Sequence, residues 1–226
     1  MSHQVKGFRA GVRKMDAKWR KRVAVVMVLV FGSLLIFFGT DGLTAFTVET
    51  ARLNELVEEK PIVPDVTLED SKERVYSFSE FDDKYVLITF IYTSCTTICL
   101  DLEMNMAQVY DLVPQEFIGE DISFLSISFD PTVDDPKTLD KYKGYFNSDG
   151  ETWRMARIPD QKELDRLLDE FGVIVIPDGY GDYAHNAAFY LVDANGKLVD
   201  VMDYQDIEGT AEKITNILEA DGGSKS

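Results

Sequence analysis

The chain has 226 residues, enough for one domain with an attached segment, and its 45% hydrophobic content is ordinary for a globular protein and argues against general disorder. Its net charge of −17 is unevenly distributed, because residues 1–22 hold eight Lys or Arg and one acid, whereas residues 23–226 hold 15 basic and 39 acidic residues. An acidic domain repels phosphate, so the composition argues against nucleic-acid binding.

An uncharged apolar stretch, residues 23–38, follows the basic segment and is itself followed by Gly39 and Thr40. Its length and composition predict a transmembrane anchor over residues 23–40, and the preceding basic residues predict a cytoplasmic N-terminus. The C-terminal domain would then lie in the periplasm or in the topologically equivalent intermembrane space. A cleaved signal peptide is the alternative, but its basic region would be unusually long and its best cleavage site carries the bulky Leu43, so we favour an uncleaved anchor.

The sequence predicts five segments, which are a basic cytoplasmic tail (1–22), a transmembrane anchor (23–40), a linker (41–60), a folded domain (61–220) and a flexible tail (221–226). Within the folded domain, an initial hairpin is expected over 61–68 and 74–78. Further strands are expected at 85–92, 122–129, 153–157, 173–176, 187–192 and 197–202, and helices at 98–112, 135–146, 160–171 and 208–219. This order predicts an α/β domain of three layers with a thioredoxin-like arrangement and an added N-terminal β-hairpin.

The only two cysteines, Cys95 and Cys99, lie where the apolar strand at 85–92 gives way to a helix. If the helix begins near Cys95, the spacing puts both sulfurs on one face of its first turn, where N–H groups and the helix dipole lower a thiol pKa. A structural disulfide would close only a very short loop and gain little stability. A regular turn also leaves the Cβ atoms about 5–6 Å apart, farther than the roughly 3.5–4.5 Å of a disulfide, so the spacing modestly favours a metal.

His185 is the only histidine between residue 41 and the end of the chain. A lone loop histidine is usually a solvated surface residue, but this one precedes the strand at 187–192, which in a thioredoxin-like sheet lies beside the cysteine-bearing strand. The loop can therefore reach the start of the helix. Two thiolates and one imidazole form a soft ligand set suited to one copper ion, whereas a structural zinc site usually has a fourth protein ligand.

Three blocks of sequence resemble the Sco/SenC family: residues 89–99 (TFIYTSCTTIC), residues 126–131 (SISFDP), and His185 followed by residues 188–196 (AFYLVDANG). The likeness covers roughly residues 61–220, with the blocks in the family's order. The chain departs from the family at Thr96 and Leu100, where members commonly have proline, and at Ala184, where an acid usually precedes the histidine. These departures leave the client open.

The resemblance implies a membrane-anchored, thioredoxin-like copper protein that serves assembly of the dinuclear copper centre of cytochrome c oxidase. It implies that Cys95, Cys99 and His185 are copper ligands, for Cu(I), Cu(II) or both. The implied partner is the copper-bearing oxidase subunit or another copper chaperone.

Two enzymatic alternatives remain open. The cysteine pair suits a thiol–disulfide reductase that keeps the client's cysteines reduced. A peroxidase of the peroxiredoxin type is weaker, because Thr93 is present but no arginine follows before Arg154. Asp130 before Pro131 is most simply a turn or helix-capping residue, and the alternative is that its carboxylate faces the copper site and orients a ligand or a partner.

Overall fold

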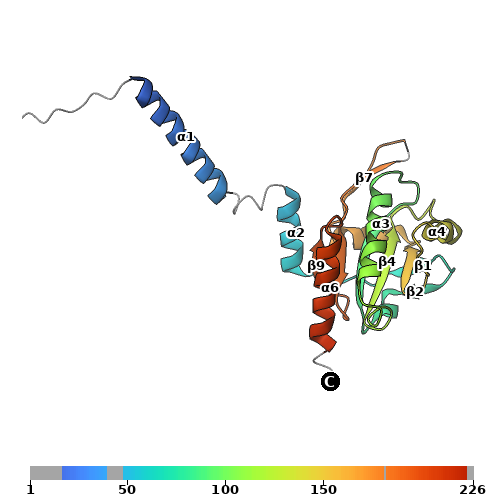
Figure 1. Cartoon of the computed structure of the whole chain (residues 1–226). Coiled ribbons are helices and arrows are strands. Elements are labelled where there is room, and N and C mark those ends of the chain that lie inside the picture. The colour runs from blue at the N-terminus through green and yellow to red at the C-terminus, as the bar shows by residue number, and fades with distance from the viewer. Residues whose placement is uncertain (1–16, 40–47, 181, 223–226) are drawn as a thin grey trace, which may run out of the picture. The chain divides into compact units, whose positions relative to one another are not determined.

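The computed structural model describes residues 17–39, 48–180 and 182–222, and it divides into two units, Met1–Ala51 and Arg52–Ser226 (Figure 1). Helix α1 spans Ala17–Gly39 and helix α2 spans Val48–Glu59. No helix among the described residues is long and apolar enough to cross a membrane. The predicted anchor is therefore unconfirmed. The predictions for residues 1–16, 40–47 and 223–226 fall outside the described part of the chain.

Seven strands of the described chain form one sheet in the order β2-β1-β5-β4-β3-β8-β9. Their bounds are β1 Thr67–Asp70, β2 Val75–Ser77, β3 Tyr85–Ile91, β4 Ile122–Ser128, β5 Trp153–Arg157, β8 Phe189–Val192 and β9 Leu198–Met202. Strands β3, β4 and β5 are parallel, whereas β1 and β8 flank them in antiparallel orientation. The apolar runs of β3 and β4 are buried because both faces of these central strands are covered.

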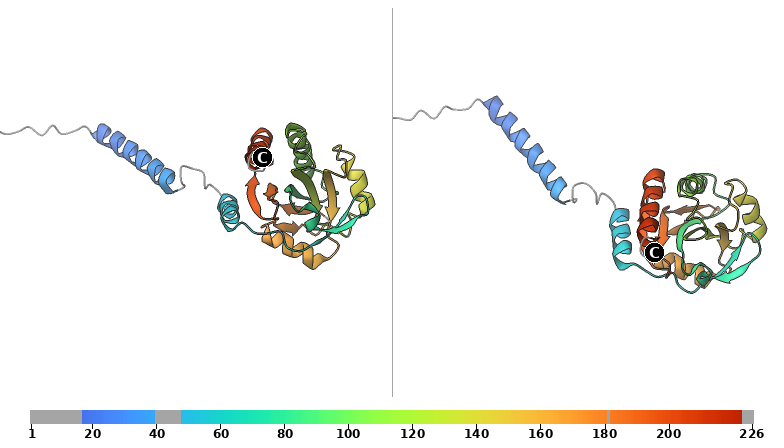
Figure 2. Two further views of the ribbon diagram at one scale, coloured as in Figure 1. Left: turned by 90° about the horizontal axis from the view of Figure 1, so that it is seen from below. Right: turned by 60° about the horizontal axis from the view of Figure 1, so that its bottom comes forward.

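The helices of this domain are α3 Ile98–Leu112, α4 Pro136–Lys143, α5 Gln161–Glu170 and α6 Ile207–Gly222, with a short 3₁₀ turn, η1, at Phe78–Phe81. In both views of Figure 2, α3 and α6 lie side by side on one face of the sheet and α5 lies on the other. This gives the three predicted layers. The Asp135 and Asp160 carboxylates cap α4 and α5, so polar residues set where these helices begin.

The segment between α5 and β8 differs from the prediction. Strand β6, Val175–Pro177, pairs with an unpredicted strand, β7, at Tyr183–His185, and the two form a separate two-stranded sheet. His185 therefore lies on a strand rather than in a loop. The turn explains the pairing, since the side chain of Asp178 accepts hydrogen bonds from the backbone N–H groups of Tyr180 and Asp182 and reverses the chain.

Candidate metal centre

Cys95 lies before helix α3 rather than inside its first turn. The helix begins at Ile98, and Thr97 has a non-helical backbone, with φ −129° and ψ −100°. Two successive β-branched residues, Thr96 and Thr97, have low helix propensity, which favours this late start. A helix start near Cys95, the condition under which both cysteines would share one regular turn, is therefore not met, whereas the predicted helix bounds of 98–112 are confirmed. The two sulfurs nevertheless remain close, because the loop folds Cys95 back over the helix start.

The sulfur of Cys95 takes the position of a helix cap. No side-chain oxygen of Thr97 caps α3, and the Sγ of Cys95 accepts a hydrogen bond from the backbone N–H of Cys99 at 3.3 Å. Burial raises the pKa of Cys95, but hydrogen bonds from the backbone N–H groups of Cys99 and Thr97 outweigh this effect and lower the pKa overall. The predicted stabilisation of a thiolate at the helix N-terminus is thus present for Cys95.

Cys99 has the opposite character. Its side chain is fully buried, and burial raises the pKa of its thiol, as do the neighbouring sulfur of Cys95 and the carboxyl of Glu103. The pair therefore consists of one sulfur disposed to carry negative charge and one disposed to keep its proton.

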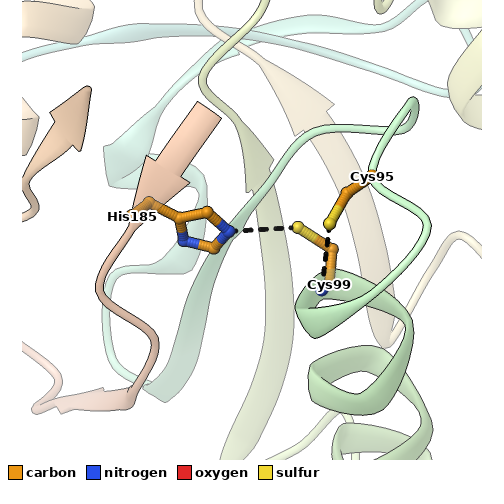
Figure 3. Close-up of side chains that lie close together, drawn as sticks. All are labelled: Cys95, Cys99 and His185. Carbon is orange, nitrogen blue, oxygen red and sulfur yellow. Dashed lines mark hydrogen bonds between the residues drawn. The ribbon is translucent and has the colours of Figure 1, made fainter. Parts of the chain in front are cut away.

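His185 points from β7 toward the cysteines (Figure 3). Its Nε2 lies 3.3 Å from the Sγ of Cys99, and its Nδ1 lies 3.0 Å from the carbonyl oxygen of Asn186. A carbonyl only accepts, so Nδ1 carries the proton and Nε2 presents its lone pair to the sulfurs. Burial lowers the pKa of His185, while the Asn186 carbonyl acts in the opposite direction, so the neutral ring is favoured.

The ligand atoms of Cys95, Cys99 and His185 all lie within 4.8 Å of one another. This is a compact set of two sulfurs and one nitrogen, a donor set that fits copper. The three residues predicted to bind metal are thus brought together. Asp130 is not among the residues whose ligand atoms converge, and its carboxylate accepts a hydrogen bond from the Thr132 hydroxyl at 2.9 Å and interacts with the side chain of Tyr183 on β7.

Asp134 supports the cysteine loop and was missed in the sequence. It is fully buried, and its Oδ2 accepts hydrogen bonds from the backbone N–H of Thr93 at 3.0 Å and from the Ser128 hydroxyl at 2.5 Å. Its Oδ1 accepts from the Thr93 hydroxyl. Burial raises the pKa of Asp134, although these donors lower it in part. The only signal was a second acid four residues after Asp130.

Glu103 lies on α3 one turn beyond Cys99 and is fully buried. Neither of its carboxyl oxygens makes a hydrogen bond to a described residue. Burial raises the pKa of Glu103 to about 8. A neutral carboxylic acid therefore lies in the core one turn from the metal centre.

Tyr92, predicted as a core residue, is buried and has a polar role as well. Its ring contacts those of Phe129, Tyr183 and His185, with centroid distances of 5.2, 5.1 and 6.1 Å. Its hydroxyl donates a hydrogen bond to Oδ1 of Asp182 at 2.6 Å. The sequence could not show this contact, because the two residues are 90 positions apart.

Comparison with known proteins identifies the family. The SCO1/SenC family model matches residues 54–219. The SCO1 protein homolog of Bacillus subtilis (strain 168) is 30% identical over 146 residues, which cover 64% of this chain and 74% of that protein. Copper-bound ScoI of Arabidopsis thaliana superposes with a TM-score of 0.61 at 18% identity, covering 70% of this chain and 99% of the other.

A third relative links the fold to thiol chemistry. BsSco superposes with a TM-score of 0.56 at 25% identity, over 69% of this chain and 94% of its own, and is described as a member of the Sco family of cytochrome c oxidase assembly proteins with a disulfide switch. The predicted resemblance and the thioredoxin-like α/β fold are both confirmed. The chain belongs to the SCO1/SenC family.

Proposed function

We propose that this protein holds one copper ion on Cys95, Cys99 and His185 and delivers it to the dinuclear copper centre of cytochrome c oxidase. The observation that carries the proposal is the convergence of two sulfurs and one imidazole nitrogen within 4.8 Å. Thiolates are soft ligands that suit Cu(I), and the imidazole supplies the nitrogen that Cu(II) prefers. The copper bound by ScoI and the oxidase-assembly role of the family of BsSco support the same assignment.

The geometry favours reversible rather than permanent binding. The described protein ligands number three, one fewer than in a closed structural zinc site, so a ligand from a client has a coordination position to enter. The proposed partner is the copper-bearing subunit of the oxidase, or another copper chaperone that loads this protein.

Copper analysis of the purified protein tests the proposal. We expect one copper per chain in the wild type and no stoichiometric copper in Cys95→Ser or Cys99→Ser. An Asp130→Ala control, changed beside the site but outside the ligand group, should retain one copper. Wild-type protein that takes up no copper after reduction and anaerobic loading would contradict the proposal.

A second candidate function is thiol–disulfide reduction of the client's cysteines, and the unequal cysteines favour it. In this reaction the Cys95 thiolate attacks the client disulfide and forms a mixed disulfide, releasing one client thiolate. Cys99 then loses its proton and attacks the Cys95 sulfur, which forms the Cys95–Cys99 disulfide and releases the second client thiolate. Two electrons pass to the client. The two roles are compatible, because copper insertion requires reduced client thiols.

We also propose that residues 23–40 anchor the protein in a membrane, with the N-terminus cytoplasmic and the C-terminal domain in the periplasm or the intermembrane space. Support comes from the uncharged apolar stretch and the basic residues before it. Intact-mass measurement of the membrane-extracted protein tests this. A mature chain that begins near Phe46 would show cleavage and contradict the anchor.

A further inference from the structure

The β6–β7 hairpin that carries His185 has little support of its own. It comprises three residue pairs, and among the described residues it forms no ladder with the seven-stranded sheet (Figure 1). Its tip is open to solvent, with Tyr180 96% exposed. An isolated two-stranded hairpin is at best marginally stable in water, so contacts with the rest of the domain must fix its position.

One side of the hairpin borders an open groove rather than the packed core of the domain. A groove of about 680 Å³ is lined by Val175, Pro177 and Tyr183 of the hairpin and by Asp165 and Asp169 of α5, among others. The position of His185 therefore depends on the contacts that the hairpin makes elsewhere.

Two sets of polar contacts attach the hairpin to the domain. At its base, the Asn186 side chain accepts from the backbone N–H of Ile174 at 2.7 Å and donates to the carbonyl of Gly172 at 3.2 Å. These residues neighbour the hairpin itself. The second set reaches the central sheet, where the Tyr92 hydroxyl donates to Asp182 at 2.6 Å and accepts from the backbone N–H of Tyr183 at 3.4 Å.

The Tyr92 hydroxyl connects the two halves of the ligand set. Tyr92 directly follows β3 and stands three residues before Cys95, and Asp182 stands three residues before His185. The hydrogen bond from the Tyr92 hydroxyl to Asp182 has a charged acceptor, and hydrogen bonds to a charged partner are the stronger kind.

We propose that Tyr92 and Asp182 form a latch that positions His185 against the cysteine pair. Tyr92 is thus a positioning residue, because it acts on the metal through the hairpin. The inference deepens the proposed copper-binding function and rests on it for its metal readout. Since Cu(I) can be held largely by two thiolates, loosening the latch should weaken Cu(II) far more than Cu(I).

The test uses Tyr92→Phe, which removes the hydroxyl and keeps the ring packing. Tyr180→Phe is the matched control, because it removes a hydroxyl from the exposed tip of the same hairpin. Asp182→Ala removes the exposed partner and provides a second variant should Tyr92→Phe fold poorly. We expect Tyr92→Phe and Asp182→Ala each to lower Cu(II) affinity roughly tenfold, the factor for one charge-assisted hydrogen bond, and Cu(I) affinity less than about twofold.

Amide exchange of the metal-free protein separates the latch from the copper proposal. Exchange over residues 183–186 should rise in Tyr92→Phe and Asp182→Ala and remain at the wild-type rate in Tyr180→Phe. Wild-type exchange in both latch variants would overturn the latch, whether or not the protein binds copper. Equal loss of Cu(I) and Cu(II) affinity would also overturn it, because it would indicate general loosening rather than displacement of His185.

Discussion

The Sγ of Cys99 lies 3.3 Å from the Nε2 of His185, although 86 residues separate them in the chain. The fold creates this relationship in two steps. Strand β8 pairs antiparallel with β3, the strand that leads into the cysteine segment, and the short β6–β7 hairpin before β8 turns the imidazole toward the start of α3. The Asn186 carbonyl then fixes the proton on Nδ1, so that the nitrogen facing the sulfur is the one able to bind metal.

We expect Asp134→Ala to destabilise the protein by about 2–4 kcal/mol, because it leaves the half-buried Thr93 N–H and the buried Ser128 hydroxyl without their acceptor. Urea unfolding of the reduced, metal-free protein measures the change. Asp130→Ala is the control and should remain within about 0.5 kcal/mol, since that carboxylate accepts from the exposed Thr132. Equal effects of the two substitutions would show that Asp134 does not support the loop.

Glu103→Gln should change how stability depends on pH. The pKa of Glu103 is about 8 in the folded protein, above the roughly 4.3 of an unfolded glutamate, so the folded state binds more protons between these values. The stabilisation that Glu103 contributes to the free energy of unfolding is therefore fully present below the pKa of the unfolded glutamate and is lost as the pH rises through about 8. Relative to Glu103→Gln, the wild type should lose stability between pH 5 and pH 8, with a slope of up to about 1.4 kcal/mol per pH unit.

Urea unfolding under reducing conditions at pH 5, 6, 7 and 8 provides the comparison. Titration of the cysteines and of His185 is common to both proteins, so the difference between the two curves isolates Glu103. Curves that run parallel over this range would mean that the carboxyl ionises in the folded protein as it does in the unfolded chain.

Oxidation of the cysteine pair should disturb the start of α3. In the reduced protein the Cys95 sulfur accepts a hydrogen bond from the Cys99 N–H, and closing a disulfide must move that sulfur onto Cys99. Amide exchange over residues 94–102 should therefore rise on oxidation, whereas exchange in the centre of β4 should not change. Unaltered protection at the helix start would indicate that the disulfide forms without breaking the cap.

The regular elements were predictable because their patterns are local. The apolar run of β3, the helical period of α3 and the capped start of α4 each lie within one short segment, and their order indicated the thioredoxin-like sheet. The resemblance and the position of His185 before β8 correctly predicted that the three candidate ligands lie together, and the predicted bounds of α3, 98–112, are those of the structure.

The features that were missed depend on partners distant in the chain. Strand β7 exists only through its pairing with β6, and the polar role of Tyr92 requires Asp182. Asp134 and Glu103 are buried carboxyls, and a charged residue in a sequence ordinarily indicates a surface position. Only the folded chain shows that one of them is surrounded by donors and the other makes no hydrogen bond to a described residue.

The measurement that tests copper carriage most directly is oxidase activity in cells that express His185→Ala at limiting copper. The imidazole takes no covalent part in disulfide chemistry, so the purified variant should retain thiol–disulfide exchange while its Cu(II) binding is nearly abolished and its Cu(I) binding is weakened. If the protein acts by carrying copper, the variant should fail to support oxidase activity, and added copper should restore it in part. Full oxidase activity of His185→Ala at limiting copper, with Cys95→Ser and Cys99→Ser both inactive, would contradict copper carriage and favour thiol reduction.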